Sequence, residues 1–203
     1  PKEILDDIFP NNPVIIMEQT SHSMIVNSLA LQSAWITEST PDPQWGIIMK
    51  DAISRKNNGI LIDNAWDIVM EIAQNSVKNK EEDDYSSLLN GLDEVRKNGI
   101  TTVWDGRLYW KRWWYDIWLK AQKNNELTAR VSLRPWLYPV GDKQEQLDFF
   151  NSIYSSDTND LLLANQVKIY SDGIPFNGTA KLWEAYEYTP FPKKPYGLNY
   201  IWP

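Results

Sequence analysis

GITTVWD, residues 99–105, is the clearest strand signal in the chain and the starting point for its architecture. This β-branched and aromatic run predicts a buried strand over residues 100–105. The preceding residues, 84–98, place apolar side chains on one helical face, and Gly99 follows where a left-handed cap would end that helix. Residues 109–124 then repeat tryptophans and aliphatic side chains at helical spacing. The sequence therefore predicts a helix, a strand and a second helix in succession.

The same alternation continues further along the chain. Residues 129–134 and 166–171 are predicted as two more strands, with a helix over residues 144–154 between them. Strands that alternate with helices of this length are typically parallel and joined by right-handed crossovers. An open sheet of this kind usually carries a glycine-rich phosphate turn, which this sequence lacks. We therefore expect an α/β fold in which residues 81–203 form part of a TIM-type (β/α)8 barrel.

The first part of the chain has a different pattern. Residues 13–17 are strand-like, and residues 27–35 and 65–73 have the spacing of short helices. Asn58-Gly59 is a turn signal before another apolar run. Because this order does not repeat the helix and strand alternation, we expect residues 1–80 to form an inserted α+β subdomain.

Composition and charge argue against several classes of function. The formal charge of −7, with acidic residues spread along the chain, argues against a nucleic acid partner, which needs clustered lysine and arginine. No stretch approaches the roughly 18 uninterrupted apolar residues of a membrane span, so we expect a soluble, cytoplasmic protein. The absence of cysteine excludes disulfides and thiolate metal ligands.

Several short blocks, in order, resemble the amidohydrolase family 3 proteins, the group that includes the N-substituted formamide deformylases. The strongest block runs from residues 5–8 through residues 13–14 to His22-Ser23 and residues 26–31, and its last part is similar to the family stretch H-S-x-x-V-N-S-x-A-L. The other blocks are residues 41–43, 59–61, 64–65, 99–105, 167–173 and 180–182, and Tyr186. Each block is short, but the ordered set is fairly specific and spans nearly the whole chain.

The resemblance assigns Lys168 a metal-binding role. The family's V-K-x-x-x-D-G strand end matches residues 167–173, and its lysine becomes carbamylated and bridges two divalent metals, usually zinc. A metal-bound hydroxide would then attack the substrate carbon. The resemblance thus implies a metal-dependent hydrolase acting on carbon–nitrogen bonds other than peptide bonds in a small molecule. Without the family match, Lys168 would be read as an ordinary lysine whose stem covers apolar surface at a strand end.

His22, the only histidine, is a candidate substrate contact. By resemblance it comes from the inserted segment and approaches the substrate rather than a metal. The alternative is a partly buried histidine with a purely structural hydrogen bond. The family commonly has Asp-Gly before this histidine, whereas Thr20-Ser21 stand there in this chain.

Three further residues are candidate substrate contacts near the mouth of the expected barrel. Asp105 ends one predicted strand, Arg134 ends the next, and Asp172 follows Lys168 by four residues. The alternatives are a turn residue beside Gly106 for Asp105, a structural ion pair for Arg134, and a turn or helix cap for Asp172.

The chain lacks most of what a two-metal site of this family requires. It contains no His-x-His pair, and a single histidine without cysteine cannot supply the nitrogen and sulfur ligands that zinc prefers. Barrels of this type need about 250 residues, whereas this chain has 203 residues and three predicted barrel strands. We therefore expect an incomplete part of the enzyme that binds no metal and is inactive alone. Open strand edges would also favour a homo-oligomer.

The tryptophans between residues 110 and 118 suggest a second function class. Exposed in a groove, they could form a non-catalytic module that binds a carbohydrate or an aromatic ligand. Because Trp110, Trp113, Trp114 and Trp118 share one helical face, packing against the barrel explains most of them. Exposed rings in a groove would favour the binding module, and rings held between helix and strands would favour the hydrolase.

Overall fold

The computed structural model describes residues 1–109, 112–138, 140–189, 191 and 193–199. The chain forms two compact units, of which unit 1 contains residues 1–77 and 170–203 and unit 2 contains residues 78–169. The boundary between units 1 and 2 at residues 77 and 78 falls within the polar stretch at residues 75–82. Residues 170–203 group with the N-terminal residues, whereas the sequence pattern predicted them as part of the barrel segment.

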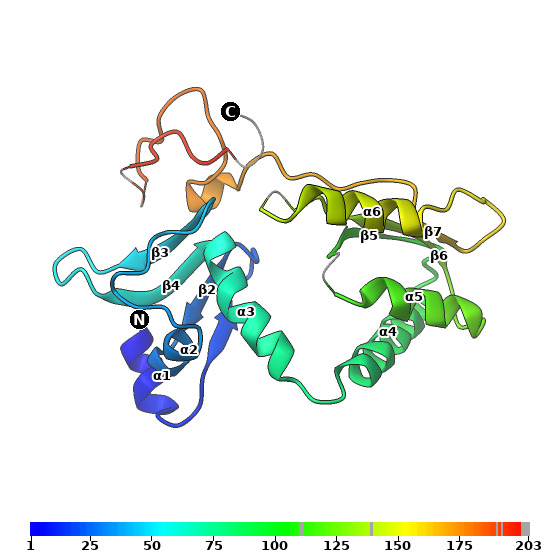
Figure 1. Ribbon diagram of the computed structural model, residues 1–203, viewed down its shortest axis with the longest axis horizontal. Coiled ribbons are helices and arrows are strands. Elements are labelled where there is room, and N and C mark those ends of the chain that lie inside the picture. Colours follow the sequence, from blue (N-terminus) through cyan, green and yellow to red (C-terminus); the bar gives the residue numbers. More distant parts are fainter. Residues whose placement is uncertain (110–111, 139, 190, 192, 200–203) are drawn as a thin grey trace. The chain divides into compact units, whose positions relative to one another are not determined.

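Unit 1 is built on an antiparallel sheet (Figure 1). Its four strands follow the order β1-β2-β4-β3. Their bounds are Ile15–Met17 for β1, Ser23–Val26 for β2, Gly46–Lys50 for β3 and Asn57–Asp63 for β4. The helices are α1 (Lys2–Ile8), α2 (Ser28–Ser33) and α3 (Asn64–Ser76), and a short 3₁₀ turn, η1, spans Pro175–Asn177. The predicted α+β character of the N-terminal residues is therefore observed.

The core of unit 1 lies between the sheet and two of its helices. Met24, Val26 and Leu61 on β2 and β4 are at most 1% exposed and contact Leu31 of α2 and Val69 of α3. These positions alternate along the strands and recur at helical spacing on α3, as the sequence pattern requires.

The turn predicted at Asn58-Gly59 is wrong, because both residues lie inside β4. Gly59 has φ +88°, a conformation that favours glycine, and an added Cβ would lie 2.4 Å from the Val26 carbonyl oxygen. The glycine therefore permits a close approach of two backbones. The hairpin loop lies earlier, where the Asp51 carboxylate accepts hydrogen bonds from the Ser54 N–H and hydroxyl.

We expect Gly59→Ala to lower the free energy of unfolding by about 2 to 3 kcal/mol, because it adds an unfavourable φ and an overpacked contact. The measurement is urea unfolding followed by circular dichroism. Gly91→Ala is the matched control, since an added Cβ meets nothing within 4 Å in the middle of a helix. It should raise stability by about 0.5 to 1 kcal/mol. Equal effects of the two substitutions would contradict the close approach at Gly59.

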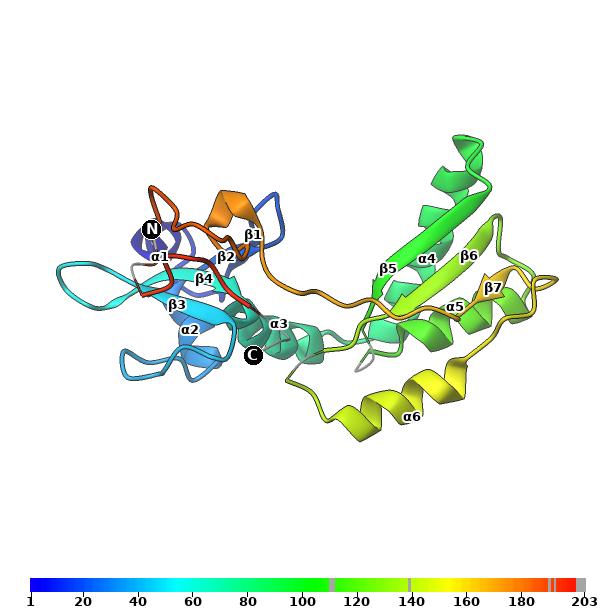
Figure 2. The same cartoon turned by 90° about the horizontal axis from the view of Figure 1, so that it is seen from above.

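Unit 2 contains a parallel sheet of three strands in the order β5-β6-β7 (Figure 2). The strands are β5 (Thr102–Leu108), β6 (Arg130–Pro135) and β7 (Leu162–Leu163). The helices are α4 (Lys80–Lys97), α5 (Trp114–Lys123) and α6 (Lys143–Ile153). The predicted α/β alternation with parallel strands is confirmed, and Gly99 has the expected left-handed φ of +68° after α4.

The core of unit 2 covers one face of the sheet. Val131 and Leu133 of β6 are fully buried and contact Leu92 of α4 and Ala121 of α5. Trp104 on β5, which lies between the half-buried Val103 and Asp105, is 64% exposed. The helices therefore cover one side of the strands and leave part of the other side accessible.

Two predicted boundaries were wrong in unit 2. The third strand is Leu162–Leu163 rather than residues 166–171, because its hydrogen bonds align with Val131 and Ser132. Helix α5 begins at Trp114, later than the predicted residue 109, while Trp110 and Lys111 fall outside the described residues. Amphipathic spacing indicates a helical face but does not fix where the helix begins. Among the described residues, no helix has the length and apolar character to cross a membrane.

Candidate functional site

Lys168 lies beside the carboxyl end of β6. Its N–H donates to the Pro135 carbonyl at 2.8 Å, and its carbonyl accepts from the Leu137 N–H at 2.9 Å. These bonds form an isolated parallel bridge with Trp136. Although residues 166–171 are not a regular strand, the backbone of Lys168 thus continues the parallel direction of the sheet. The side chain is half-buried.

Aromatic side chains surround the point where Lys168 meets β6. Trp136 is 6% exposed, and its ring centroid lies 5.6 Å from that of Tyr109 and 4.7 Å from that of Tyr138. The Arg107 guanidinium carbon lies 4.6 Å from the Trp136 ring centroid. The backbone of Lys168 therefore pairs with the chain at a largely buried aromatic cluster.

Asp105 and Arg134 lie on the same sheet as this cluster. The Asp105 carboxylate accepts from the Arg107 N–H at 3.1 Å, where the β5–β6 register shifts. This local bond corresponds to the turn role that was the alternative for Asp105. The Arg134 guanidinium carbon lies 4.4 Å from the Trp104 ring centroid, and its buried Nε has no hydrogen-bond partner in the described part of the chain. Substrate contact by either residue stays a prediction.

His22 belongs to unit 1 and pairs with Asp63, a residue that no sequence motif indicated. Its Nδ1 lies 2.7 Å from Oδ1 of Asp63, whose side chain is 4% exposed, whereas that of His22 is 25% exposed. The backbones meet as well, because the Asp63 N–H donates to the His22 carbonyl at 2.9 Å. Asp63 precedes a helix and resembles an ordinary cap in the sequence, so no local signal relates it to a histidine 41 positions away.

The turn before His22 keeps a conformation that favours glycine. Ser21 stands where the family commonly has glycine and has φ +61°. Hydrogen bonds from the hydroxyl and N–H of Thr20 lower the pKa of Glu18, and the nearby His22 lowers that pKa further. Serine and threonine therefore support this turn in place of Asp-Gly, with the Glu18 carboxylate as the acceptor.

Asp172 also lies in unit 1, where it fastens a loop. One carboxylate oxygen accepts from the Ser171 hydroxyl at 2.9 Å, and the other accepts from the Lys181 N–H at 2.7 Å. This is the turn role that was the alternative for Asp172, and a substrate contact stays a prediction. Lys168, Asp105 and Arg134 thus belong to unit 2, while His22 and Asp172 belong to unit 1.

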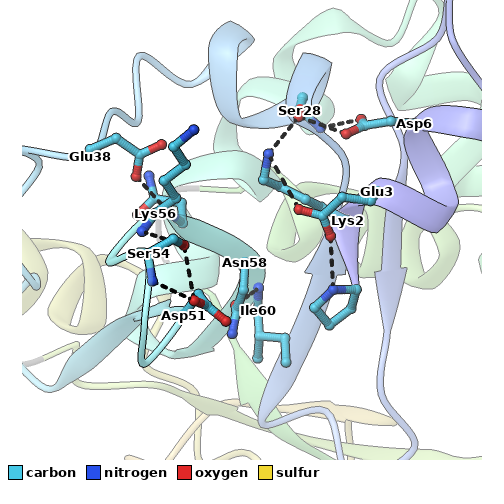
Figure 3. A network of polar contacts seen from close by, with 12 residues as sticks. Lys2, Glu3, Asp6, Ser28, Glu38, Asp51, Ser54, Lys56, Asn58 and Ile60 are labelled. Carbon is cyan, nitrogen blue, oxygen red and sulfur yellow. Dashed lines mark hydrogen bonds and ion pairs between the residues drawn. The ribbon is translucent and has the colours of Figure 1, made fainter.

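Unit 1 also has a pocket of about 540 Å³ beside helices α1 and α2. Figure 3 shows the polar network at its wall, where the Lys2 ammonium donates to the Ser28 hydroxyl at 3.0 Å and that hydroxyl donates to Asp6 at 2.8 Å. Burial raises the pKa of Asp6, but hydrogen bonds from the Ser28 N–H and hydroxyl, together with Lys2, hold it below its usual value. None of the predicted site residues lines this pocket.

The tryptophans of α5 contribute mainly to packing. Trp114 and Trp118 are partly buried against the core of unit 2. Trp113 is half-buried, with the Lys80 ammonium 3.7 Å from its ring centroid. The packing prediction is therefore confirmed for Trp114 and Trp118, while Trp110 lies outside the described residues.

Within the described ranges, no group of three or more histidine, cysteine, aspartate or glutamate side chains could hold a metal ion. The sole histidine belongs to unit 1, whereas Lys168 belongs to unit 2. The donor set of this chain therefore does not fit a complete metal centre.

Comparison with known proteins gives a consistent picture. The model of the amidohydrolase family matches residues 1–199. The chain is 29% identical to the protein YtcJ of Bacillus subtilis (strain 168), in a match that covers 93% of this chain. It is 30% identical to an N-substituted formamide deformylase of Arthrobacter pascens, in a match that covers 50% of this chain. These matches span 34% and 19% of the two relatives. A crystal structure of a metal-dependent hydrolase from Pyrococcus horikoshii OT3 is similar over 98% of this chain and 36% of that chain, with a TM-score of 0.63 and 18% identity. The chain thus spans about a third of the length of YtcJ and of the solved hydrolase, and the structural likeness shows a shared fold.

Proposed function

The chain belongs to the amidohydrolase family, and from this membership we propose that it is one part of a metal-dependent hydrolase that cleaves carbon–nitrogen bonds other than peptide bonds. The observation that carries the proposal is the place of Lys168 beside the carboxyl end of the parallel strand β6. Active sites of (β/α)8 barrels are built at this end of the strands. A lysine held here by its backbone could act as a ligand once carbamylated.

The proposed architecture is a partial barrel. Three parallel strands with helices against one face, and the exposed Trp104 on the other, are what a segment of a barrel wall would show. Sequence outside these 203 residues would supply the remaining strands, since the chain matches only 34% of YtcJ. Residues 1–80 would be an insertion in that barrel. If other copies rather than the same chain covered the strand edges, the protein would form an oligomer.

The metal would depend on residues outside this chain. Lys168 would be one ligand of a divalent metal, for which zinc is our proposal on the basis of the resemblance. The described residues do not complete that site, so the isolated 203-residue chain should be inactive.

The substrate is proposed to be a small N-substituted amide or formamide. Support comes from the relative from Arthrobacter pascens, which is an N-substituted formamide deformylase. Its match covers half of this chain, and one fold serves many substrates. His22, Asp105, Arg134 and Asp172 remain the proposed substrate contacts.

The test is an assay of the whole protein that contains this chain, with added zinc and a series of N-alkylformamides, following formate release. We expect metal-dependent release that a chelator abolishes and zinc restores. The purified 203-residue chain is the control and should neither release formate nor retain stoichiometric zinc by elemental analysis. Release that is insensitive to the chelator, or stoichiometric zinc on the isolated chain, would contradict the proposal.

A non-catalytic module for aromatic ligands is the second candidate, favoured by Trp104, which is 64% exposed beneath Arg134. It predicts saturable quenching of tryptophan fluorescence in the 203-residue chain by an aromatic carboxylate such as benzoate, and loss of that quenching in Trp104→Leu. The hydrolase proposal predicts no saturable binding to the isolated chain.

A further inference from the structure

We propose that Asp63 is a positioning residue that holds His22 with Nδ1 protonated and Nε2 turned outward to meet the substrate. The substrate contact rests on the proposed function, whereas the orientation of the ring rests on unit 1 alone. Neither the sequence nor the family comparison assigns a role to Asp63.

The two residues are set opposite each other by the sheet. Strands β2 and β4 pair with Ser23 opposite Ile62, so that His22 and Asp63 form the next pair along the ladder. The Asp63 N–H donates to the His22 carbonyl at 2.9 Å. Neighbouring positions are anchored in the core by Met24 and Leu61, which are 1% and 0% exposed. The two residues are therefore brought together at the end of the β2–β4 ladder, where this backbone hydrogen bond joins them.

Asp63 shows three features that an ordinary helix cap does not explain. It precedes α3, yet its carboxylate caps none of the N–H groups of that helix. Its φ of +47° and ψ of −131° are unfavourable for a residue with a Cβ. Its Oδ2 is buried without a hydrogen-bond partner among the described residues. Strain and an unsatisfied buried oxygen cost stability, so they indicate selection for something other than stability.

The contact fixes the chemistry of the imidazole ring. An ionised carboxylate can only accept hydrogen bonds, so the 2.7 Å contact with Oδ1 requires the proton on Nδ1. A neutral ring carries one ring proton, which leaves the lone pair on Nε2. His22 is 25% exposed, and its Nε2 is on the ring edge away from Asp63. The pair therefore presents a preoriented acceptor on a partly exposed ring.

The first test reads this proton directly by NMR. Because the chain has one histidine, a tag-free sample labelled with ¹⁵N-histidine gives a single imidazole signal set. At about pH 9, well above the ordinary histidine range, we expect the Nδ1–H tautomer in the 203-residue protein and a shift toward Nε2–H in Asp63→Ala. Asp7→Ala, at an exposed position on α1, is the matched control and should leave the tautomer unchanged. An Nε2–H tautomer in the unsubstituted chain overturns the proposal even if Asp63→Ala does not fold.

The second test separates positioning from a structural role in the whole protein. We expect Asp63→Asn to lower kcat/KM by about tenfold to 100-fold, as loss of a residue that orients a functional histidine does. Once His22→Gln is present, Asp63→Asn should cause no further loss, because the two residues act as one unit. Additive losses overturn the positioning role. If the whole protein hydrolyses no formamide, the proposed function and the substrate contact fail, while the tautomer still decides the orientation of the ring.

Discussion

Replacing Asn27 with alanine is expected to lower the free energy of unfolding by about 3 to 5 kcal/mol, because each buried polar group left unpaired costs about 1 to 3 kcal/mol. Asn27 is 0% exposed. Its Oδ1 accepts from the N–H groups of Val14 and Ala30 at 2.9 and 3.0 Å, and its Nδ2 donates to the Asn12 carbonyl at 2.8 Å. One amide thus caps α2 and joins that helix to the segment before β1. The asparagine of the family motif in residues 22–31 therefore has a structural role.

The measurement is equilibrium urea unfolding of the 203-residue chain. Ser33→Ala on the same helix is the control, since its exposed hydroxyl donates to the Leu29 carbonyl within the helix, and a change within about 0.5 kcal/mol is expected. Asn27→Asp tests the network more finely, because it keeps the acceptor for Ala30 but places an oxygen against the Asn12 carbonyl. It should be nearly as destabilising as alanine. A loss below about 1 kcal/mol in Asn27→Ala would show that water replaces the amide.

Replacing Lys168 with alanine is expected to lower kcat/KM of the whole protein by on the order of 10³-fold, because a bound metal contributes several kcal/mol and each 1.4 kcal/mol is a factor of ten. The expectation rests on the proposed function. Metal content, measured by elemental analysis, should fall together with activity. Circular dichroism of the variant should match that of the unsubstituted protein, since the backbone bonds of Lys168 do not require its side chain.

Two further variants test whether Lys168 acts as a carbamate ligand or only through its positive charge. Lys168→Arg keeps a positive charge but cannot supply carbamate oxygens, so it should lose as much activity as Lys168→Ala. Lys123→Ala, at the exposed last residue of α5, should change kcat/KM less than twofold. Full activity in Lys168→Arg would show that only the charge is needed, and the metal-ligand role would be wrong.

The alternation of helices and strands in residues 84–163 could be predicted because each element carries its own periodicity. The leucines of α4 recur at helical spacing, and the β-branched residues of β5 follow one another directly. A pattern of a few residues is therefore enough to predict each element. The position of the third strand was missed because residues 161–164 and 167–170 are both rich in strand-forming apolar side chains. Only hydrogen bonds from Val131 and Ser132 select the first run.

Single residues of the candidate site could be predicted from the sequence, but the contacts between distant residues could not. Lys168 was identified from a family motif, and its place beside Trp136 agrees with a strand end. Asp63 was missed because its partner is 41 residues away and its local context resembles a helix cap. A contact between distant residues leaves no periodic trace in one sequence.

The sequence by itself determined the α/β class of unit 2, the α+β class of the N-terminal residues and the family, since these depend on short-range patterns and ordered motifs. Only the tertiary structure decided that Gly59 lies inside a strand, that residues 170–203 group with unit 1, and that His22 meets a buried carboxylate. Those outcomes depend on which strands pair and how closely their backbones approach. Such choices are made by the summed packing and hydrogen bonding of the whole unit and not by any single segment.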